Sequence, residues 1–379
     1  MPQDKIIYLD NAATTIVNNE VLEAYNKAKK LYFANPSSIH IPGQEAGRLL
    51  EKARLQILAI LKCEKDHELI FTSGATEANN LALKGYALKH MNRGKHIITS
   101  NVEHPSVLET VKQLEESFGF EVTYLPVNKE GVVELEALQK VMRKDTILVS
   151  LMEVNNEIGT INPIHDIAIW LKNYPLTAFH VDATQGMGKI NFPYEEVDMI
   201  SFSGHKIHGL NSSGALIKRK KIELLPLLSG GGQENNYRSG TNDVALAVSL
   251  AKALRLSYEK MDENYKKLEP IADYLKQYIA SHPDLYEINS GNNPYIVNFS
   301  LLNKKASVVV EALSSKGVMV SSTSACHAKE EPISYVVKAL GKSDNLAHNT
   351  IRVSLSDESS LDDIKIFIAR LEEIVKGLV

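Results

Sequence analysis

The run Ser203-Gly204-His205-Lys206 places a lysine amine beside an imidazole and a hydroxyl. A lysine amine held near a carbonyl carbon can form a Schiff base, because its lone pair attacks that carbon. Most lysines are solvated surface charges, so the run alone does not establish a catalytic amine. The hypothesis depends on what the rest of the chain brings to Lys206.

A candidate anion site lies in Ser73-Gly74-Ala75-Thr76, between an apolar segment and an Ala/Leu/Asn-rich segment. A strand, a tight turn and a helix start direct free backbone N–H groups and the positive end of the helix dipole at the turn. Ser73 and Thr76 add hydroxyl groups. A plain capped helix explains the same residues equally well.

Two further polar residues follow apolar segments. Asp182 lies in His180-Val181-Asp182-Ala183-Thr184-Gln185, and His104 stands directly before Pro105. Either residue, taken alone, is more often a helix cap. A carboxylate beside a pyridine nitrogen would instead keep that nitrogen protonated and make the ring an electron sink.

A pyridoxal phosphate site needs five kinds of group: a lysine, an acid for the ring nitrogen, a cap over the ring, phosphate donors and an arginine for the substrate carboxylate. The chain offers a candidate for each: Lys206, Asp182, His104, Thr76 and Arg352. An arginine on a strand is usually a surface charge, although guanidinium geometry suits a carboxylate. Together these residues predict pyridoxal 5'-phosphate as the cofactor.

The chain has only two cysteines, Cys63 and Cys326. Two are too few for a disulfide scaffold, so any thiol chemistry rests on one side chain. Cys63 ends a predicted helix and is best explained as a small hydrophobic residue. Cys326 lies in Ser321-Ser322-Thr323-Ser324-Ala325-Cys326-His327, whose small polar residues favour an accessible thiol over a buried one.

Short apolar strands alternate with helices along the first two thirds of the chain. We expect strands at Ile6–Leu9, 69–72, 96–100, 121–125, 147–152, 178–182, 199–203 and 215–218. This pattern predicts an α/β fold with a mostly parallel sheet covered by helices on both faces. Ligands of such sheets lie beyond the carboxyl ends of the strands. Thr76, His104, Asn155, Asp182 and Lys206 all follow predicted strands and should face one pocket.

A second, smaller α+β domain is predicted in the last third of the chain. A long helical stretch begins at Val244, is interrupted at Pro270, and precedes strands at 295–299, 318–321 and 351–355. We expect a large domain of residues 15–258 and a small domain of residues 1–14 and 259–379 that carries the Cys326 loop. The glycines at 230–232 are either a linker or, with Arg238 and Thr241 nearby, a loop that meets an anion.

Composition excludes several classes of partner. The 379 residues are 44% hydrophobic and 23% charged, with a net charge of −4. No basic excess indicates nucleic acid or an anionic membrane surface, and no apolar run approaches a membrane span. Residues 1–10 lack the features of a signal peptide, so we expect a cytoplasmic protein. We expect no metal site.

With these residues, the sequence resembles the NifS/IscS-type cysteine desulfurases, which are fold type I enzymes of the class V aminotransferase family. The matching segments occur in family order and span nearly the whole chain: Tyr8–Thr15, Asn35–Ser38, Thr72–Glu77, Glu103-His104, Asn155–Gly159, His180–Gln185, Ser203–Lys206, Arg238–Thr241, Ser324–Cys326 and Ile351-Arg352.

The resemblance implies a role for each site residue. Lys206 binds the cofactor covalently and moves protons, His104 stacks on the ring, Asp182 pairs with the ring nitrogen, and Gln185 reaches the phenolic oxygen. The phosphate is bound by Ala75, Thr76, Ser203 and His205, and by Thr241 of a partner subunit, which implies a homodimer. Asn155 and Arg352 bind the substrate carboxylate.

The implied reaction converts L-cysteine to L-alanine. The Cys326 thiolate takes the sulfur as a persulfide and passes it to an acceptor protein, in iron–sulfur cluster assembly or tRNA thiolation. The alternatives are a selenocysteine lyase, an aminotransferase, a specialised desulfurase-like enzyme, and an inactive binding subunit. Cys326 argues against an aminotransferase, and intact Lys206, Asp182 and His104 argue against an inactive subunit.

Several segments depart from the family pattern. His208–Ser212 replaces Tyr-Gly-Pro-Lys-Gly, Ser356-Asp357 replaces Gly-Arg, and Asn235–Tyr237 and His327 also differ. None of these departures removes a residue that the resemblance assigns to the cofactor.

Overall fold

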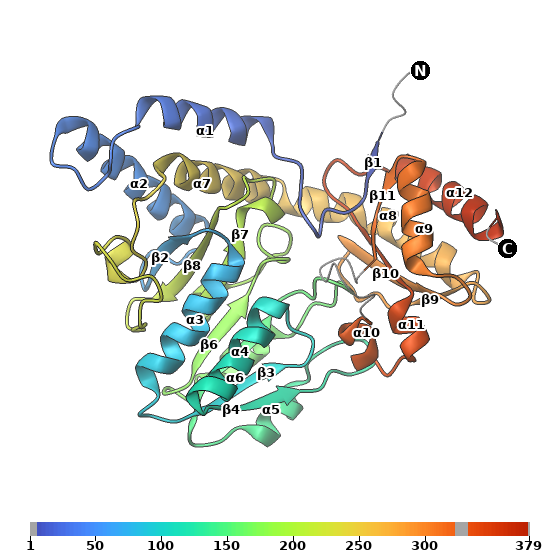
Figure 1. Ribbon diagram of the computed structural model, residues 1–379, viewed down its shortest axis with the longest axis horizontal. Coiled ribbons are helices and arrows are strands. Elements are labelled where there is room, and N and C mark those ends of the chain that lie inside the picture. Colours follow the sequence, from blue (N-terminus) through green and yellow to red (C-terminus); the bar gives the residue numbers. More distant parts are fainter. Residues whose placement is uncertain (1–5, 323–332, 378–379) are drawn as a thin grey trace.

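The computed structural model describes residues 6–322 and 333–377 and shows two bodies side by side (Figure 1). The larger body is a sheet between helices. The smaller body contains the C-terminal third of the chain and strand β1 from the N-terminal segment. Cys326 and its immediate neighbours lie outside the described residues.

The large sheet has seven strands in the order β2-β8-β7-β6-β5-β3-β4. Their bounds are β2 His67–Thr72, β3 His96–Ser100, β4 Glu121–Leu125, β5 Thr146–Met152, β6 Ala178–Asp182, β7 Met199–Ser203 and β8 Gly214–Arg219. Only β8 runs against the other six, since it pairs antiparallel with both β2 and β7. The carboxyl ends of β2, β3, β5, β6 and β7 therefore meet at one edge, as predicted.

Helices cover both faces of this sheet because its strands are apolar on both sides. Val149 and Leu151 point to one buried cluster, whereas Leu148, directly before them, points to another. The first cluster is covered by α2 Ile41–Ile60, α5 Leu135–Val141, α6 Ile164–Leu171 and α7 Val244–Glu259. The second is covered by α3 Ala75–His90 and α4 Pro105–Phe118. Helix α1, Asn19–Leu31, packs on α7 and is capped by Asn18, whose side chain accepts from the Glu20 N–H.

The smaller body is built on an antiparallel sheet, β12-β13-β10-β9. Its strands are β9 Tyr286–Ile288, β10 Ile296–Leu301, β12 Ser321–Ser322 and β13 Thr350–Ser354; β1 Ile7–Tyr8 pairs with β11 Val318–Met319 beside them. Helices α8 Met261–Ala280, α9 Ala306–Ser315 and α12 Leu361–Gly377 complete one buried core, which includes Ile7 and Leu9. The N-terminal strand thus belongs to the C-terminal core.

Two short helices join the bodies. Helices α10 Tyr335–Ala339 and α11 Asp344–His348 contribute Val336 and Ala347 to a small apolar cluster. That cluster also contains Val102 and Ile158, which lie just after β3 and β5. The contact sets the smaller body against the edge where the strands end.

The predicted break at Pro270 is wrong. Pro270 lies inside α8, and the chain turns instead at Lys260, between α7 and α8. A proline inside a helix frees the carbonyl four residues earlier, here that of Lys266. Both residues are exposed, so water can hydrogen-bond that carbonyl and the helix continues.

Candidate active site

A cavity of about 370 Å³ lies where the strand ends meet the smaller body. Nine of the expected site residues line it: Ala75, Thr76, His104, Asp182, Gln185, Ser203, His205, Lys206 and Arg352. They come from both bodies and are up to 277 residues apart (352 minus 75). Asn155 and Thr241 do not line the cavity, and Cys326 lies outside the described residues.

Lys206 ends the single turn Gly204–Lys206 that follows β7. Its Nζ donates to the carbonyl oxygens of Ala12 and Ala13, each at 2.7 Å. The N-terminal segment therefore holds the amine at the cavity. Burial and the Lys206 charge lower the pKa of His205 to about 4, so its ring is neutral near pH 7.

Asp182 is the last residue of β6 and is buried at the cavity wall. Asn79 of α3 donates from Nδ2 to its Oδ2 at 2.8 Å, and the Thr184 N–H donates to its Oδ1 at 3.0 Å. These bonds fix the plane of the carboxylate. The arrangement suits an acid that must meet a protonated nitrogen of a ligand.

His104 combines the two roles that the sequence left open. It is the N-cap of α4, where its Nδ1 accepts from the Ser106 N–H at 3.1 Å. The same ring lines the cavity. Burial lowers its pKa below the ordinary value for histidine, so a flat, neutral ring faces the site. A neutral ring suits stacking on an aromatic ligand.

The start of α3 forms an anion cradle. The N–H of Ala75 donates to Ser203 Oγ at 2.7 Å, which ties the helix end to β7. A Cβ atom on Gly214 would lie 2.6 Å from the Gly74 Cα, so the turn packs directly on β8 and needs glycine there. Thr76 adds a hydroxyl at the cavity wall. Free N–H groups and the helix dipole favour a phosphate at this end.

Arg352 on β13 supplies the positive charge at the opposite end. Its Nη2 donates to Asp10 Oδ1 at 3.0 Å and its Nη1 to the Asn156 carbonyl at 2.9 Å. In the described part of the chain, the buried Arg352 Nε and Asn156 Oδ1 have no hydrogen-bond partner. Burial raises the pKa of Asp10, although Arg352 opposes that effect. A guanidinium with unused donor capacity fits a ligand carboxylate.

The structure places the remaining two expected residues elsewhere. Asn155 donates from Nδ2 to the Val102 carbonyl at 3.0 Å, and its Oδ1 accepts from the N–H groups of Glu157 and Ile158. The side chain thus shapes the turn that presents Asn156 to the cavity. Thr241 is exposed and lines a separate hollow near Ser73 and Arg238.

Sequence reasoning missed several groups that contact or neighbour the site residues. Asn79 orients Asp182, the carbonyls of Ala12 and Ala13 bind Lys206, and Asn156 lines the cavity beside Arg352. Asn79 lies one turn into the helix after the Ser73–Thr76 motif, on the face that carries Ala75. That spacing is the one signal that could have found it.

Comparison with known proteins decides the family. The family model for class-V aminotransferases matches residues 7–367. The chain belongs to the class-V aminotransferase family. One relative of this family, named cysteine desulfurase IscS, from Dictyoglomus turgidum, is 42% identical over 377 residues, 98% of this chain and 95% of its own length.

Two solved structures of relatives have the same fold. A protein described as NifS-like superposes with a TM-score of 0.91 at 37% identity, covering 99% of this chain and all of its own. A structure described as SspA in complex with cysteine gives a TM-score of 0.79 at 34% identity, covering 93% of this chain and 100% of its own. The predicted α/β fold of a pyridoxal phosphate enzyme is therefore confirmed.

The cavity fits pyridoxal phosphate, the cofactor of the class-V aminotransferase family. The α3 cradle matches its phosphate, the buried Asp182 carboxylate its ring nitrogen, and the neutral His104 ring its flat face. Lys206 lies on the same cavity wall. Within residues 6–322 and 333–377, no three histidine, cysteine or acidic side chains are grouped to bind a metal ion, and no helix is long and apolar enough to cross a membrane.

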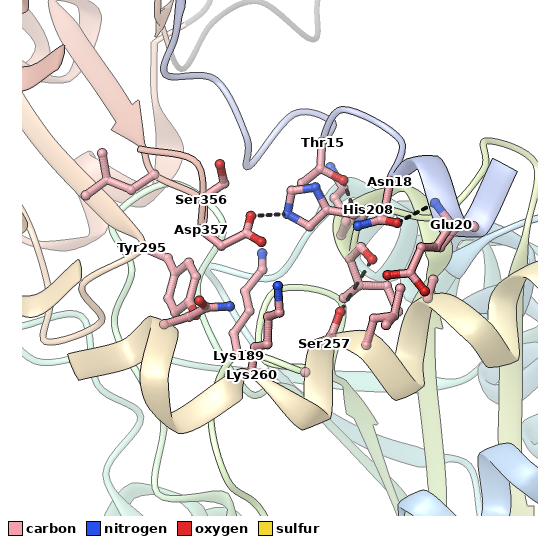
Figure 2. Close-up of a pocket in the computed structure, with 18 residues that line it drawn as sticks. Thr15, Asn18, Glu20, Lys189, His208, Ser257, Lys260, Tyr295, Ser356 and Asp357 are labelled. Carbon is pink, nitrogen blue, oxygen red and sulfur yellow. Dashed lines mark hydrogen bonds and ion pairs between the residues drawn. The ribbon is translucent and has the colours of Figure 1, made fainter. Parts of the chain in front are cut away.

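Two departures from the family pattern contact each other. His208 lies two residues after Lys206, and its Nε2 is 3.1 Å from Asp357 Oδ1 (Figure 2). The Nδ1 atom of the same ring is 2.9 Å from the Ile16 carbonyl oxygen. A carboxylate oxygen and a carbonyl oxygen both accept, so the two contacts favour the doubly protonated imidazole. Although burial lowers the pKa of His208, the bond to Asp357 and its charge raise it above the ordinary value. The pair links the Lys206 loop to the loop after Arg352.

This pair predicts a pH-dependent link between the bodies. Because the pKa of His208 is raised, its interaction stabilises the folded state fully below about pH 6.5, and this stabilisation is lost as the pH rises through the folded-state pKa of His208. Because the pKa of Asp357 is lowered, the contribution of Asp357 is fully present only above about pH 4. In urea unfolding, a double-mutant cycle of His208→Asn and Asp357→Asn should give a coupling of about 1 kcal/mol at pH 6 that falls toward zero by about pH 8.5. Equal coupling at both pH values would contradict this assignment. Asparagine is the matched replacement because His208 has a φ of 58°.

Proposed function

We propose that the protein is a pyridoxal phosphate-dependent cysteine desulfurase that converts L-cysteine to L-alanine. The observation that carries this proposal is one cavity in which Lys206, Asp182 and Arg352 meet, in a chain 42% identical to a protein named cysteine desulfurase. The cavity has an anion cradle at one end and a guanidinium at the other. It thus has separate places for the cofactor phosphate and for the carboxylate of an amino acid.

The residues that line the cavity have distinct tasks in this proposal. Lys206 anchors the cofactor and moves a proton at the substrate α-carbon, while Asp182 keeps the ring nitrogen protonated. His104 covers the ring, and Ala75, Thr76, Ser203 and His205 bind the phosphate. Arg352 binds the substrate carboxylate, and Asn155 shapes the neighbouring turn that presents Asn156 to the cavity. Pyridoxal phosphate supplies the electron sink that weakens the bond between the β-carbon and sulfur.

The sulfur passes to Cys326. The Cys326 thiolate attacks the sulfur of cysteine, a sulfur–sulfur bond forms, and the bond between that sulfur and the β-carbon breaks. The carbon fragment keeps the electron pair of the broken bond and gains protons to become alanine, so cysteine and a thiol give alanine and a persulfide. No external oxidant is needed. Cys63 cannot replace Cys326, because burial raises the pKa of its thiol to about 12.

The partners follow from this chemistry. An acceptor protein must collect the persulfide sulfur, as iron–sulfur cluster assembly or tRNA thiolation requires, and the cytoplasm is the compartment expected for that exchange. Residues 15–258 form the large domain in this account, and residues 1–14 and 259–379 form the small one that carries Cys326. Separate buried cores, with Ile7 and Leu9 in the second, support that division.

A homodimer completes the phosphate site in this proposal. Thr241 is exposed and lies away from its own cavity, as a residue serving a partner subunit would. Phe33 and Ile39, between α1 and α2, and Ile41, at the start of α2, are 79%, 91% and 70% exposed. A second copy that buried them would remove a costly apolar surface. Sedimentation should give twice the mass of one chain; a monomer would contradict this part.

The test of the function is product formation from L-cysteine. The wild-type protein loaded with pyridoxal phosphate should release alanine, and sulfide in the presence of a thiol reductant, in equal amounts. Cys326→Ala should lower both rates by about 10³-fold, whereas Cys63→Ala, the matched control, should change neither by more than about twofold. Equal rates in Cys326→Ala and wild type would contradict the proposed mechanism. Formation of a keto acid in place of alanine would identify an aminotransferase.

A further inference from the structure

Lys189 is a buried lysine that the proposed mechanism does not use. Lys189 lies four residues after Gln185. Consecutive turns follow β6 there, and hydrogen bonds to the carbonyls of Ala183 and Gly186 close them. This spacing places both side chains on one side of the backbone. Lys189 Nζ donates to Gln185 Oε1 at 3.2 Å.

Lys189 forms no ion pair within residues 6–322 and 333–377. The Asp357 carboxylate lines the same small cavity, but it pairs with His208. Burial, together with the charges of Lys206 and Arg352, lowers the pKa of Lys189 to about 7. A buried amine without an ion pair is costly, which indicates a specific role.

Both bodies hold Lys189 in place. It lines a cavity of about 60 Å³ together with Lys206 and His208 (Figure 2). Its Nζ lies 5.7 Å from the centre of the ring of Tyr295. Tyr295 is the residue directly before β10 of the smaller body. A cavity of this size has room for only a few water molecules.

The contacts of the Gln185 amide leave it one orientation. Lys189 Nζ donates to the amide oxygen, which therefore faces the amine. The Ala12 carbonyl only accepts, so the amide nitrogen must face it; Gln185 Nε2 donates to that oxygen at 3.0 Å. Ala12 also accepts from Lys206, which makes one chain of contacts from Lys189 through Gln185 to the catalytic amine. The second N–H of Gln185 remains for the cavity that it lines.

We propose that Lys189 is a positioning residue that fixes the Gln185 amide with an N–H group toward the phenolic oxygen of the cofactor. This inference rests on the proposed cofactor site, and it does not require that the substrate be cysteine. The fixed donor would stabilise the ionised phenolic oxygen and so lower the pH at which the bound cofactor titrates.

The test measures the visible absorption of the bound cofactor against pH without substrate. Lys189→Met should raise the titration midpoint by about one pH unit. The control is Lys260→Met, because Lys260 lines the same small cavity but does not bind Gln185. This control should move the midpoint by less than about 0.3 pH unit. Gln185→Leu should raise the midpoint by at least as much as Lys189→Met. In the Gln185→Leu background, Lys189→Met should add less than about 0.3 unit.

An unchanged midpoint in Lys189→Met, or the same shift with and without Gln185, would overturn the proposal. Methionine is expected to fold because it removes a buried amine, and the melting temperature of the cofactor-free protein checks this. If Lys189→Met does not fold, an unchanged midpoint in Gln185→Leu overturns the proposal by itself. A protein that binds and titrates the cofactor but makes no alanine from cysteine would refute the proposed function and leave this result standing.

Discussion

Lys206→Ala is expected to abolish the visible absorption of the cofactor and to lower alanine formation from L-cysteine by about 10⁴-fold or more. The amine lies at the cavity wall, where the carbonyls of Ala12 and Ala13 hold it. Without it, the cofactor has no covalent anchor and the α-carbon has no group to move its proton. Absorption spectra of the purified protein and an alanine assay measure the two effects separately.

Lys206→Arg is the matched control for charge. Arginine keeps a cation and donors for the two carbonyls, yet its guanidinium is protonated at any pH used and cannot act as a nucleophile. It should fail as completely as alanine does. A Lys206 variant with more than about 1% of wild-type activity would contradict the assignment of the amine.

Arg352→Gln is expected to weaken the binding of L-cysteine about 100-fold. Arg352 is 8% exposed, is bound to Asp10 and to the Asn156 carbonyl, and retains an unpartnered Nε among the described residues. Glutamine keeps a hydrogen-bond donor and loses the charge. Spectral titration of the cofactor-loaded protein with cysteine gives the dissociation constant.

Cysteamine, which is cysteine without its carboxylate, separates substrate binding from general damage. If Arg352 recognises the carboxylate, Arg352→Gln should change the dissociation constant of cysteamine by less than about threefold. Asp10→Asn, which removes the partner of Arg352 and leaves the arginine, serves as the second control and should retain the preference for cysteine. Equal losses for cysteine and cysteamine would show that Arg352 only supports the fold.

The large sheet could be predicted from the sequence almost residue by residue. Strands β3, β4, β6 and β7 have the predicted bounds. Strands β3, β6 and β7 are buried along their whole length, whereas β4 is a partly exposed strand at the edge of the sheet. The shared edge of Thr76, His104, Asp182 and Lys206 followed from that pattern, since parallel strands end on the same side. Pro270 misled because local chain chemistry does not show that the Lys266 carbonyl is exposed to water.

The contacts between distant segments could not be predicted. His208 and Asp357 were two separate departures from the family pattern, and their contact spans 149 residues of sequence (357 minus 208). Lys189 resembled any solvated lysine until its burial and its bond to Gln185 were known. Asn155 and Asn156 are neighbours of the same type, and only the turn geometry shows which of them faces the cavity. Such distinctions depend on tertiary packing, which a local pattern does not encode.

The central claim is that sulfur from cysteine moves to one named thiol, and the mass of the protein after a single turnover tests it most directly. The cofactor-loaded protein is mixed with one equivalent of L-cysteine, digested without reductant and analysed by peptide mass spectrometry. One additional sulfur atom on the peptide that contains Cys326, removed by a thiol reductant and absent in Lys206→Ala, is the predicted result. The added sulfur on the Cys63 peptide, or alanine released with neither peptide modified, would contradict the account.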